Sequence, residues 1–377
     1  MGNIFLSQFE SLFEKGKFSR FSLVNTLSSD TEETVWKERP VRLVKNQFSA
    51  IPIISSIRIQ QFCKQKLKMV LQYAQEEIEK YSPEIIWGVL NSVNQIFFID
   101  ALMQRVDLPF VITIWDSPEL LIQRLRLDTW TAQNVLFTFY KILNKAKHVT
   151  VICDGMGKYF EKNGTATPYS VIHTGILEES KVSIRKQKPK SDVLHIAFTG
   201  SIYSKLEWNA FVQAIEYWNK THQQKIEFHV AGSLPKFGIY FPKFIDYRGI
   251  LSPNEANLLL QRADIAYLPY WFDKKKEMVV KTSFPSKLSA YIAMGIPVFF
   301  HGPHYASVCQ VMKKYRIGIS CHSLDVKNII ATLKQLLDDN LFYDNYYIER
   351  KNVFDEELSS IVMINRYKDI INRILNT

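Results

Sequence analysis

The sequence predicts an α/β protein built from two doubly wound parallel sheets, and three observations support this prediction. The chain has 377 residues, more than one hydrophobic core usually holds, so two domains are expected. Apolar runs of strand length alternate with helical periodicity from about residue 57, as in parallel α/β folds. A polar, basic stretch interrupts this alternation, which then resumes. We therefore predict an N-terminal domain at 1–177, a linker at 178–192, a second domain at 193–353 and a closing helix at 354–377.

In the first predicted domain, the apolar pattern is irregular before about residue 57 and regular after it. Within the irregular part, we expect a helix at 4–13, strands at 21–24 and 41–44 and a loop at 28–38. Within the regular part, we expect helices at about 57–80, 90–105 and 118–146, a short helix after 152, and strands at 85–89, 110–114, 149–152 and 169–172.

The second predicted domain repeats the alternation of strands and helices. The pattern predicts strands at 193–199, 226–231, 244–247, 265–268, 297–300 and 317–320, and helices at 206–220, 253–262, 283–295, 304–314, 325–338 and 358–375.

The segment SFPSKLSAYIAMGIPVFFHGP, residues 283–303, combines a helix start, a turn and a buried strand. Ser283 is expected to cap the helix, with Pro285 in its first turn, and Gly295 to end it. Lys287 is unusual there, because a helix N-terminus already carries partial positive charge and unpaired N–H groups. A bound phosphate would resolve that conflict. The alternative is that Lys287 extends into water.

Charge and cysteine content limit the possible functions. Lys and Arg outnumber Asp and Glu by 20 to 19 in residues 1–180 and by 27 to 18 in residues 181–377, so the second half favours an acidic ligand. The four cysteines lie far apart without a C-x-x-C pair, which argues against a disulfide framework and suits a reducing compartment. No signal peptide or membrane-spanning run is visible, so we expect a cytoplasmic protein.

Small or glycine-containing turns follow the predicted strands of the second half. Ligands of parallel sheets bind beyond the carboxyl ends of the strands, so these turns are candidate site positions. Glycine lets the backbone approach a phosphate closely, and lysine adds point charge. The residues at these turns are Gly200, Ser201, Lys205, Gly232, Gly249, Ile250 and Tyr270.

The order of these segments resembles a known family. The succession AFTGSIYSK, FHVAGS, DYRGILSPNEANLLLQRADIAYLP and FPSKLSAYIAMGIPV, within about 193–335, is similar to the nucleotide-sugar-binding half of GT-B glycosyltransferases, particularly family 4. Upstream, VTIWDSPE, HVTVICDGMGKYF and YSVIHTGI resemble strand ends of that family's acceptor domain. The resemblance implies two Rossmann-like domains facing across a cleft, with the sugar donor held mostly by the second.

The resemblance also implies roles for individual residues. Lys205 and Lys287 would act as catalytic cations on the donor diphosphate, assisted by the backbone at Gly200 and Ser201. The turn of Arg248, Gly249 and Ile250 would hold the base. The other donor-binding residues that it implies are Gly232, Tyr270, Lys281, Thr282, Ser283, Phe284, Pro285, Ser286 and Leu288.

Several positions depart from the family pattern. Ser201 and Ile202 stand where an arginine is usual, and Thr282 and Ala290 stand where many members have two glutamates. The second glutamate of the family ordinarily contacts ribose. These departures keep an alternative open, in which the chain is a non-catalytic GT-B-like subunit that binds a nucleotide or a glycan.

Asp116 follows the predicted strand FVITIW, where the family often has a His-Asp pair. It is predicted to be catalytic through contact with the acceptor or the transferred sugar, and the alternative is a helix cap before Pro118. Asp154 has the same two interpretations, lining the site or capping a helix. His173 stands in the expected interdomain turn and is expected to be structural.

The sequence predicts a metal-independent glycosyltransferase. No D-x-D pair is present, and His301 and His304 have no carboxylate nearby in sequence, so we expect no metal site and no cofactor besides the nucleotide-sugar co-substrate. Without a metal, lysines and helix N–H groups would stabilise the leaving nucleoside diphosphate. The expected acceptor is a glycan, such as a growing surface polysaccharide, or a lipid-linked sugar.

The run at 118–148 combines basic side chains with Trp130 and Phe137. It is expected either to pack as an ordinary helix on the first sheet or to lie on a membrane that carries a lipid-linked acceptor. In the second case the protein would be peripheral at the inner face of the membrane. A nucleic-acid partner is not expected, because no reading motif is recognisable.

Overall fold

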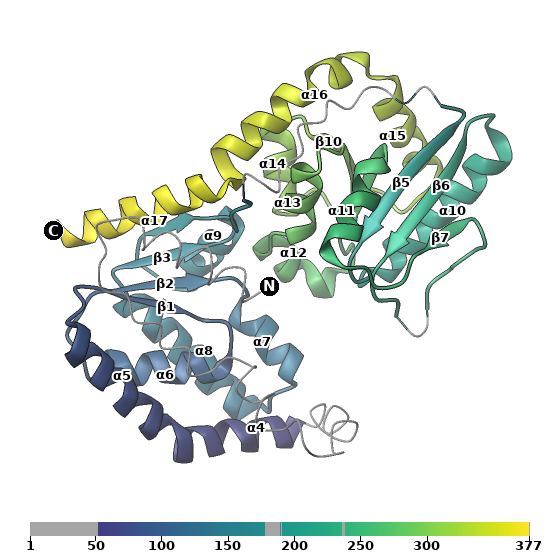
Figure 1. Ribbon diagram of the computed structural model, residues 1–377. Helices are drawn as coiled ribbons and strands as arrows, with labels where there is room; N and C mark the ends of the chain where they lie inside the picture. Colours follow the sequence, from purple (N-terminus) through teal and green to yellow (C-terminus); the bar gives the residue numbers. More distant parts are fainter. Residues whose placement is uncertain (1–51, 178–188, 190, 236–237, 377) are drawn as a thin grey trace. The chain divides into compact units, whose positions relative to one another are not determined.

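The computed structural model describes residues 52–177, 189, 191–235 and 238–376 (Figure 1). The elements expected at 4–13, 21–24, 28–38 and 41–44, and most of the expected linker, lie outside these residues. The chain divides into two compact units. One comprises residues up to Val151 with Phe160–Ser170 and the chain from Ile370, and the other comprises Ile152–Tyr159 and Val171–Asp369. Each has a parallel sheet, so the predicted two-domain α/β fold class is confirmed.

The first unit has a four-stranded sheet in sequential order. Its strands are β1 (Ile86–Val89), β2 (Phe110–Ile114), β3 (His148–Val151) and β4 (Tyr169–Val171). Both β1 and β3 pair with β2 in parallel, and every residue of β2 and β3 is buried. Burial on both faces explains why these strands are nearly continuous apolar runs.

Most described helices before β4 lie close to where the apolar periodicity predicts them. The helices in this part of the chain are α4 (Pro52–Gln61), the π-helical turn η1 (Phe62–Lys66), α5 (Leu67–Tyr81), α6 (Val93–Met103), α7 (Pro118–Leu125), α8 (Thr129–Lys145) and α9 (Asp154–Lys162).

The prediction of a single helix at 118–146 is wrong, because the chain turns between α7 and α8. Arg126 ends α7 with a left-handed backbone at a φ of 51°. Asp128 then begins α8, since its carboxylate accepts hydrogen bonds from the N–H and the hydroxyl of Thr131. Hydrogen bonds from Ser56 and Thr131 also lower the pKa of Asp128 to about 2. The aspartate cap therefore restarts the helix within an otherwise continuous periodic pattern.

The second unit has a six-stranded parallel sheet in the order β10-β9-β8-β5-β6-β7. From β5, the chain builds outward to β6 and β7, then returns to the other side of β5 to add β8, β9 and β10. The reversal between β5 and β8 makes a topological switch point, where ligands of such sheets bind. The strands are β5 (Val193–Thr199), β6 (Lys225–Ala231), β7 (Ile245–Tyr247), β8 (Ile265–Pro269), β9 (Val298–His301) and β10 (Gly318–Cys321).

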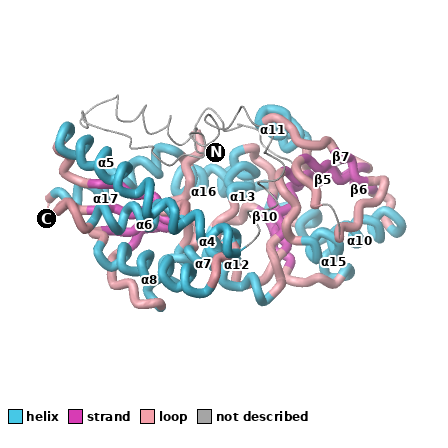
Figure 2. The backbone as a smooth tube through the Cα atoms, turned by 90° about the horizontal axis from the view of Figure 1, so that it is seen from below, coloured by secondary structure: helices cyan, strands magenta, loops and turns pink. Residues whose placement is uncertain are grey.

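Helices cover both faces of this sheet. Helices α10 (Lys205–Thr221) and α15 (Val326–Asp338) pack against each other on one face, and α11 (Pro253–Arg262) contacts β5 from the other (Figure 2). The remaining helices are η3 (Lys274–Lys276), α12 (Glu277–Thr282), α13 (Ser286–Ala293), α14 (Val308–Lys314), α16 (Asn340–Val353), the π-helical turn η4 (Phe354–Leu358) and α17 (Ser360–Leu375).

The sequence pattern does not predict η3, α12 or α16, and the closing helix predicted at 354–377 is interrupted at Ser359, between η4 and α17. In α16 the buried face combines Phe342 and Tyr346 with Arg350, and a charged residue in an apolar stripe hides the helical pattern. Asp339 begins this helix by accepting a hydrogen bond from the N–H of Phe342. These elements complete the second unit, and α16 also supplies a residue that fixes the candidate site.

Candidate functional site at the carboxyl edge of the six-stranded sheet

Three glycine turns meet at the carboxyl ends of β5, β6 and β7. Gly200, Gly232 and Gly249 have φ angles of 107°, 133° and 69°, in the left-handed region that favours glycine. The N–H of Gly200 donates to the carbonyl of Ala231 at 2.8 Å, and that of Gly232 to the carbonyl of Gly249 at 2.7 Å. A Cβ on Gly232 would lie 2.0 Å from the Gly200 carbonyl oxygen. These two N–H groups therefore fasten the turns to one another.

Lys287 extends over this group of turns. Its Cε lies 2.6 Å from the position that a Cβ on Gly200 would take, and its Nζ lies 4.6 Å from the Tyr203 ring centroid and 5.5 Å from that of Phe198. Within the described ranges of the chain, no hydrogen bond or ion pair reaches this ammonium. Burial lowers the pKa of Lys287 to about 8. A half-buried cation is costly without an anion, so an anionic ligand would be strongly favoured here.

The prediction that Ser283 caps α13 is wrong. Pro285 takes the N-cap position and offers no side-chain cap, whereas the Ser283 hydroxyl bonds the hydroxyl of Tyr270 at 3.0 Å. The backbone N–H groups of Ser286 and Lys287 have no acceptor in the part of the chain that the structure describes. Two unpaired N–H groups and an ammonium at one helix start form the arrangement that binds phosphate groups in proteins.

Arg350 of α16 fixes the opposite end of α13. Its guanidinium is buried and donates to the carbonyls of Ile292 at 2.8 Å and Ala293 at 2.9 Å. A cation at a helix C-terminus satisfies unpaired carbonyls and stabilises the helix dipole. Arg350 therefore holds the helix that carries Lys287, a role that sequence reasoning missed because α16 lies more than 40 residues beyond α13.

Two other predicted cations have carboxylate partners, and a third is exposed. Lys281 pairs with Glu277 on α12, and Arg248 lies 2.7 Å from Asp246 on β7. Lys205 begins α10, is exposed, and lies beside Gly238, where a Cβ would be 3.2 Å from its Nζ. Of these candidate donor-binding cations, Lys287 is thus the one that is both half-buried and without a carboxylate.

Three residues of the predicted donor-binding segment are engaged inside the second unit. The Thr282 hydroxyl donates to the carbonyl of Met278 at 2.9 Å, and the Phe284 ring stacks on His173 at 4.1 Å. Burial lowers the pKa of His173 to about 4, so this stacked ring is neutral at pH 7. Leu288 is fully buried in the core.

The remaining predicted donor-binding residues lie at the sheet edge or near it. The hydroxyl of Ser201 bonds that of Ser233 at 2.7 Å, which joins the turns after β5 and β6. Tyr270 is buried directly after β8, and Ser286 is exposed at the start of α13. Ile250 is 82% exposed, so its side chain offers apolar surface to a ligand next to Gly249.

Sequence reasoning also missed Glu207, which supports the loop after β8. This residue of α10 is buried, and its carboxylate accepts the N–H of Phe272 at 2.6 Å. Burial raises its pKa. The sequence does not indicate that Glu207 binds the N–H of Phe272, because acidic residues in the first turn of a helix commonly face water.

Asp116 lies shortly after β2 in the first unit. Its carboxylate lies 3.4 Å from the guanidinium of Arg124, and both side chains are more than one-third exposed. Ser117, and not Asp116, takes the N-cap position of α7, so the cap interpretation of Asp116 is wrong. Asp154 is the first residue of α9 and lies 2.6 Å from the ammonium of Lys158.

Comparison with known proteins identifies the fold. No protein-family model matches the sequence, and no curated protein does either. Sucrose-phosphate synthase from Thermosynechococcus elongatus matches with a TM-score of 0.60 and 10% identity, over 82% of this chain and 78% of that one. Anabaena HepE in complex with UDP and glucose matches with a TM-score of 0.56 and 11% identity, over 81% of each chain.

A third match is an α,α-trehalose-phosphate synthase (UDP-forming) from Burkholderia vietnamiensis, with a TM-score of 0.54 and 10% identity over 82% of this chain and 77% of that one. At such identities the likeness shows the fold. The chain has the GT-B fold that the sequence resemblance predicted. Among the residues that the structure describes, no helix is both long and apolar enough to cross a membrane.

Proposed function

We propose that this protein is a glycosyltransferase that moves a sugar from a nucleotide-sugar donor to a glycan or lipid-linked acceptor. The environment of Lys287 is the observation that carries the proposal. A half-buried ammonium, two unpaired N–H groups of α13 and the glycine turns of β5 and β6 lie at the switch point of the sheet. These features suit a diphosphate, which carries the charge that the site lacks.

The chemistry follows from the charge that develops during transfer. As the bond between the sugar and the diphosphate breaks, negative charge accumulates on the leaving nucleoside diphosphate. Lys287 and the N–H groups of α13 stabilise that charge in the transition state more than in the ground state, which accelerates the reaction. The absence of a D-x-D pair from the sequence supports a metal-independent transfer of this kind.

Uridine nucleotides are the first donors to test. Separate structures of Anabaena HepE contain UDP and UDP-glucose, and that protein shares the fold of this chain. The turn of Arg248, Gly249 and Ile250 is our candidate for the base, and Lys205 for a second contact with the diphosphate. Ala290 stands where the family commonly offers a carboxylate to ribose, so we expect weaker ribose recognition here than in those members.

A ligand screen tests the proposal. The full chain is mixed with UDP-, GDP-, ADP- and dTDP-sugars, thermal stability and calorimetric binding are measured, and released nucleoside diphosphate is followed with and without acceptor sugars. Binding with turnover supports a transferase. Binding without turnover under any acceptor supports the alternative of a non-catalytic GT-B-like subunit, and no binding of any nucleotide-sugar contradicts the transferase and leaves only a glycan-binding subunit.

The surface of α8 supports a peripheral membrane position as a second part of the proposal. Trp130 is 65% exposed and Phe137 is 72% exposed, and the seven-residue spacing puts both on one side of the helix. Exposed aromatic side chains suit the interface of a membrane. Liposome flotation with and without anionic lipid tests this, with Trp130→Ser combined with Phe137→Ser as the control. If the protein does not float with either kind of liposome, the peripheral membrane position is contradicted.

A further inference from the structure

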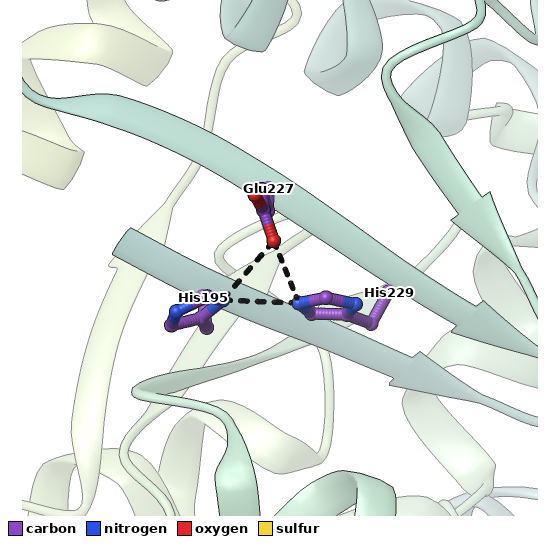
Figure 3. A group of neighbouring side chains, drawn as sticks. All are labelled: His195, Glu227 and His229. Carbon is purple, nitrogen blue, oxygen red and sulfur yellow. Dashed lines mark hydrogen bonds and ion pairs between the residues drawn. The ribbon is translucent and has the colours of Figure 1, made fainter. Parts of the chain in front are cut away.

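A second cluster of chemically active side chains lies on one face of the six-stranded sheet (Figure 3). His195 on β5 is the register partner of Glu227 on β6, and His229 on β6 is the partner of Asp246 on β7. Partners in a parallel sheet project to the same face, as do residues two apart on one strand. Strand register therefore brings the side chains of three strands together.

The ligand atoms of three of these residues form a triangle of suitable size for a metal ion. Nδ1 of His195 lies 3.1 Å from Nε2 of His229, and the nearest Glu227 oxygen lies 3.5 Å and 3.7 Å from these two nitrogens. Metal–nitrogen distances of about 2.0–2.1 Å in a tetrahedral zinc site require ligand atoms about 3.3 Å apart. The three atoms already have nearly that spacing.

Asp246 supplies an independent sign of a metal site. Its carboxylate lies 2.8 Å from Nδ1 of His229, the ring nitrogen that faces away from the triangle. Arg248 in turn holds the same carboxylate oxygen. Metal-ligating histidines commonly donate their second nitrogen to such a carboxylate, which fixes the tautomer that leaves Nε2 available.

We propose that His195, Glu227 and His229 bind one divalent transition-metal ion, with Zn²⁺ as the best match. Two imidazoles and a carboxylate form a ligand set typical of zinc, and three protein ligands leave a fourth position for water. The side chains of His195, Glu227 and His229 are 37%, 55% and 20% exposed, so the ion can enter from solvent. Binding requires that His195 carries its proton on Nε2, which leaves Nδ1 free to ligate, and the ion then replaces the hydrogen bond between Nδ1 of His195 and Nε2 of His229.

This site is separate from the proposed donor site and does not depend on it. Gly232 lies three residues beyond His229 along the chain, a distance of about 10 Å in an extended strand. The ion would tie β5 to β6, and through Asp246 to β7 and Arg248. We therefore expect it to stabilise the second unit rather than take part in transfer. This cluster was not recognised in the sequence, because strand register brings His195 beside Glu227 and His229, which lie more than 30 positions further along the chain.

Calorimetric titration of the full, metal-stripped chain with Zn²⁺ tests the proposal. We expect one equivalent to bind and the melting temperature to rise with it. His195→Ala and His229→Ala should each weaken binding more than about 100-fold, and Asp246→Asn about 10–100-fold, as losses of ligands and of their hydrogen-bonded supports do. His304→Ala, which removes an exposed histidine outside the cluster, should leave binding unchanged.

The Co²⁺ form distinguishes this site from adventitious binding. Co²⁺ in a tetrahedral nitrogen and oxygen site gives visible absorption bands, whereas a cysteine ligand adds a near-ultraviolet charge-transfer band. We expect the visible bands without the thiolate band, and their loss in Glu227→Gln, whose fold circular dichroism can verify. No stoichiometric Zn²⁺ binding, or equal binding by the parent and both histidine variants, overturns the proposal and leaves a hydrogen-bonded His195–His229–Asp246 chain.

Discussion

The two sheets of this protein differ in the residues that come directly after their strands. After β5 and β6 in the six-stranded sheet, Gly200 and Gly232 make tight turns, and Lys287 lies over Gly200 without a carboxylate partner in the described part of the chain. Beyond β2 in the four-stranded sheet stands Asp116, whose charge is balanced by Arg124. Of these two edges, the first keeps a charge that no carboxylate among the described residues neutralises. An ionic ligand therefore contributes most at the edge of the six-stranded sheet.

The charged groups at the two sheet edges also differ in their contribution to the free energy of folding. The Asp116–Arg124 pair is exposed, and such pairs contribute little to folding. Lys287 is instead held where burial lowers its pKa to about 8, which costs folding free energy as long as the ammonium is charged. A group kept under such strain commonly marks a functional site. Substitutions at Lys287, Gly232 and Asp116 test this contrast, and the expected effects decrease in size from the first edge to the second.

Removal of Lys287 should have the largest effect on catalysis. Lys287→Ala should lower kcat about 100-fold, because the loss of one charge-stabilising donor costs ~3 kcal/mol of transition-state stabilisation. Turnover of the donor found in the ligand screen measures this. Lys327→Ala, which removes an exposed lysine on α15, is the matched control and should keep parent activity. Equal turnover by the Lys287 variant and the parent would contradict the assignment of Lys287 to the donor diphosphate.

Substitution of Gly232 should have the largest effect on stability. In Gly232→Ala the new Cβ meets the Gly200 carbonyl and the backbone keeps a φ of 133°, so the free energy of unfolding should fall by about 3 kcal/mol. Gly164→Ala in the first unit has a φ of 92° with open space around it, and should cost about 1 kcal/mol. Denaturant unfolding of both variants compares them. Equal losses would mean that the close contact between the turns is unimportant.

The lowered pKa of Lys287 should make the stability of the protein depend on pH. The pKa of Lys287 is about 8 in the folded chain and 10.5 unfolded, so the unfolded chain binds more protons between these values. The free energy of unfolding should therefore rise with pH across this window, by about 3 kcal/mol from this residue. Lys287→Met should remove that rise and be more stable than the parent at pH 7. If the free energy of unfolding rises with pH equally in Lys287→Met and in the parent, the predicted effect of burying Lys287 is wrong.

The smallest effect should come from the edge of the four-stranded sheet. Asp116→Asn and Arg124→Gln break the same ion pair, and each should change the free energy of unfolding by less than about 1 kcal/mol. If Asp116 also contacts the acceptor or the transferred sugar, kcat/KM should fall about tenfold in Asp116→Asn, or ~1.4 kcal/mol, and much less in Arg124→Gln. Equal kinetics in the two variants would assign Asp116 to the ion pair alone.

Local patterns in the sequence were sufficient for the fold and for part of the site. A strand such as Phe110–Ile114 is an apolar run because both of its faces are covered, and helices between the strands carry one apolar face. Both signals depend on neighbouring residues, so they can be recognised without the structure. The glycines after the strands and the anomalous lysine in a first helical turn are equally local. They placed Gly200, Gly232 and Lys287 in the candidate site before the strands were paired.

Tertiary structure decided which charged groups are free and which are paired. Lys281 and Arg248 were candidate donor-binding cations, as Lys287 was, until their carboxylate partners, Glu277 and Asp246, were located. Arg350 reaches α13 from a helix that the sequence did not predict. Ion pairs depend on distances across the fold, and these result from packing and not from local periodicity.

The same reason explains why the histidine cluster was invisible in the sequence. Glu227 and His229 are two residues apart and share a face by strand geometry alone, but His195 joins them through the register of β5 against β6. A shift of one residue in that register would turn His195 to the opposite face. The sequence alone determined two parallel-sheet units and a lysine in need of an anion. The tertiary structure determined its lack of a carboxylate partner and assembled the cluster, because both depend on contacts between distant segments.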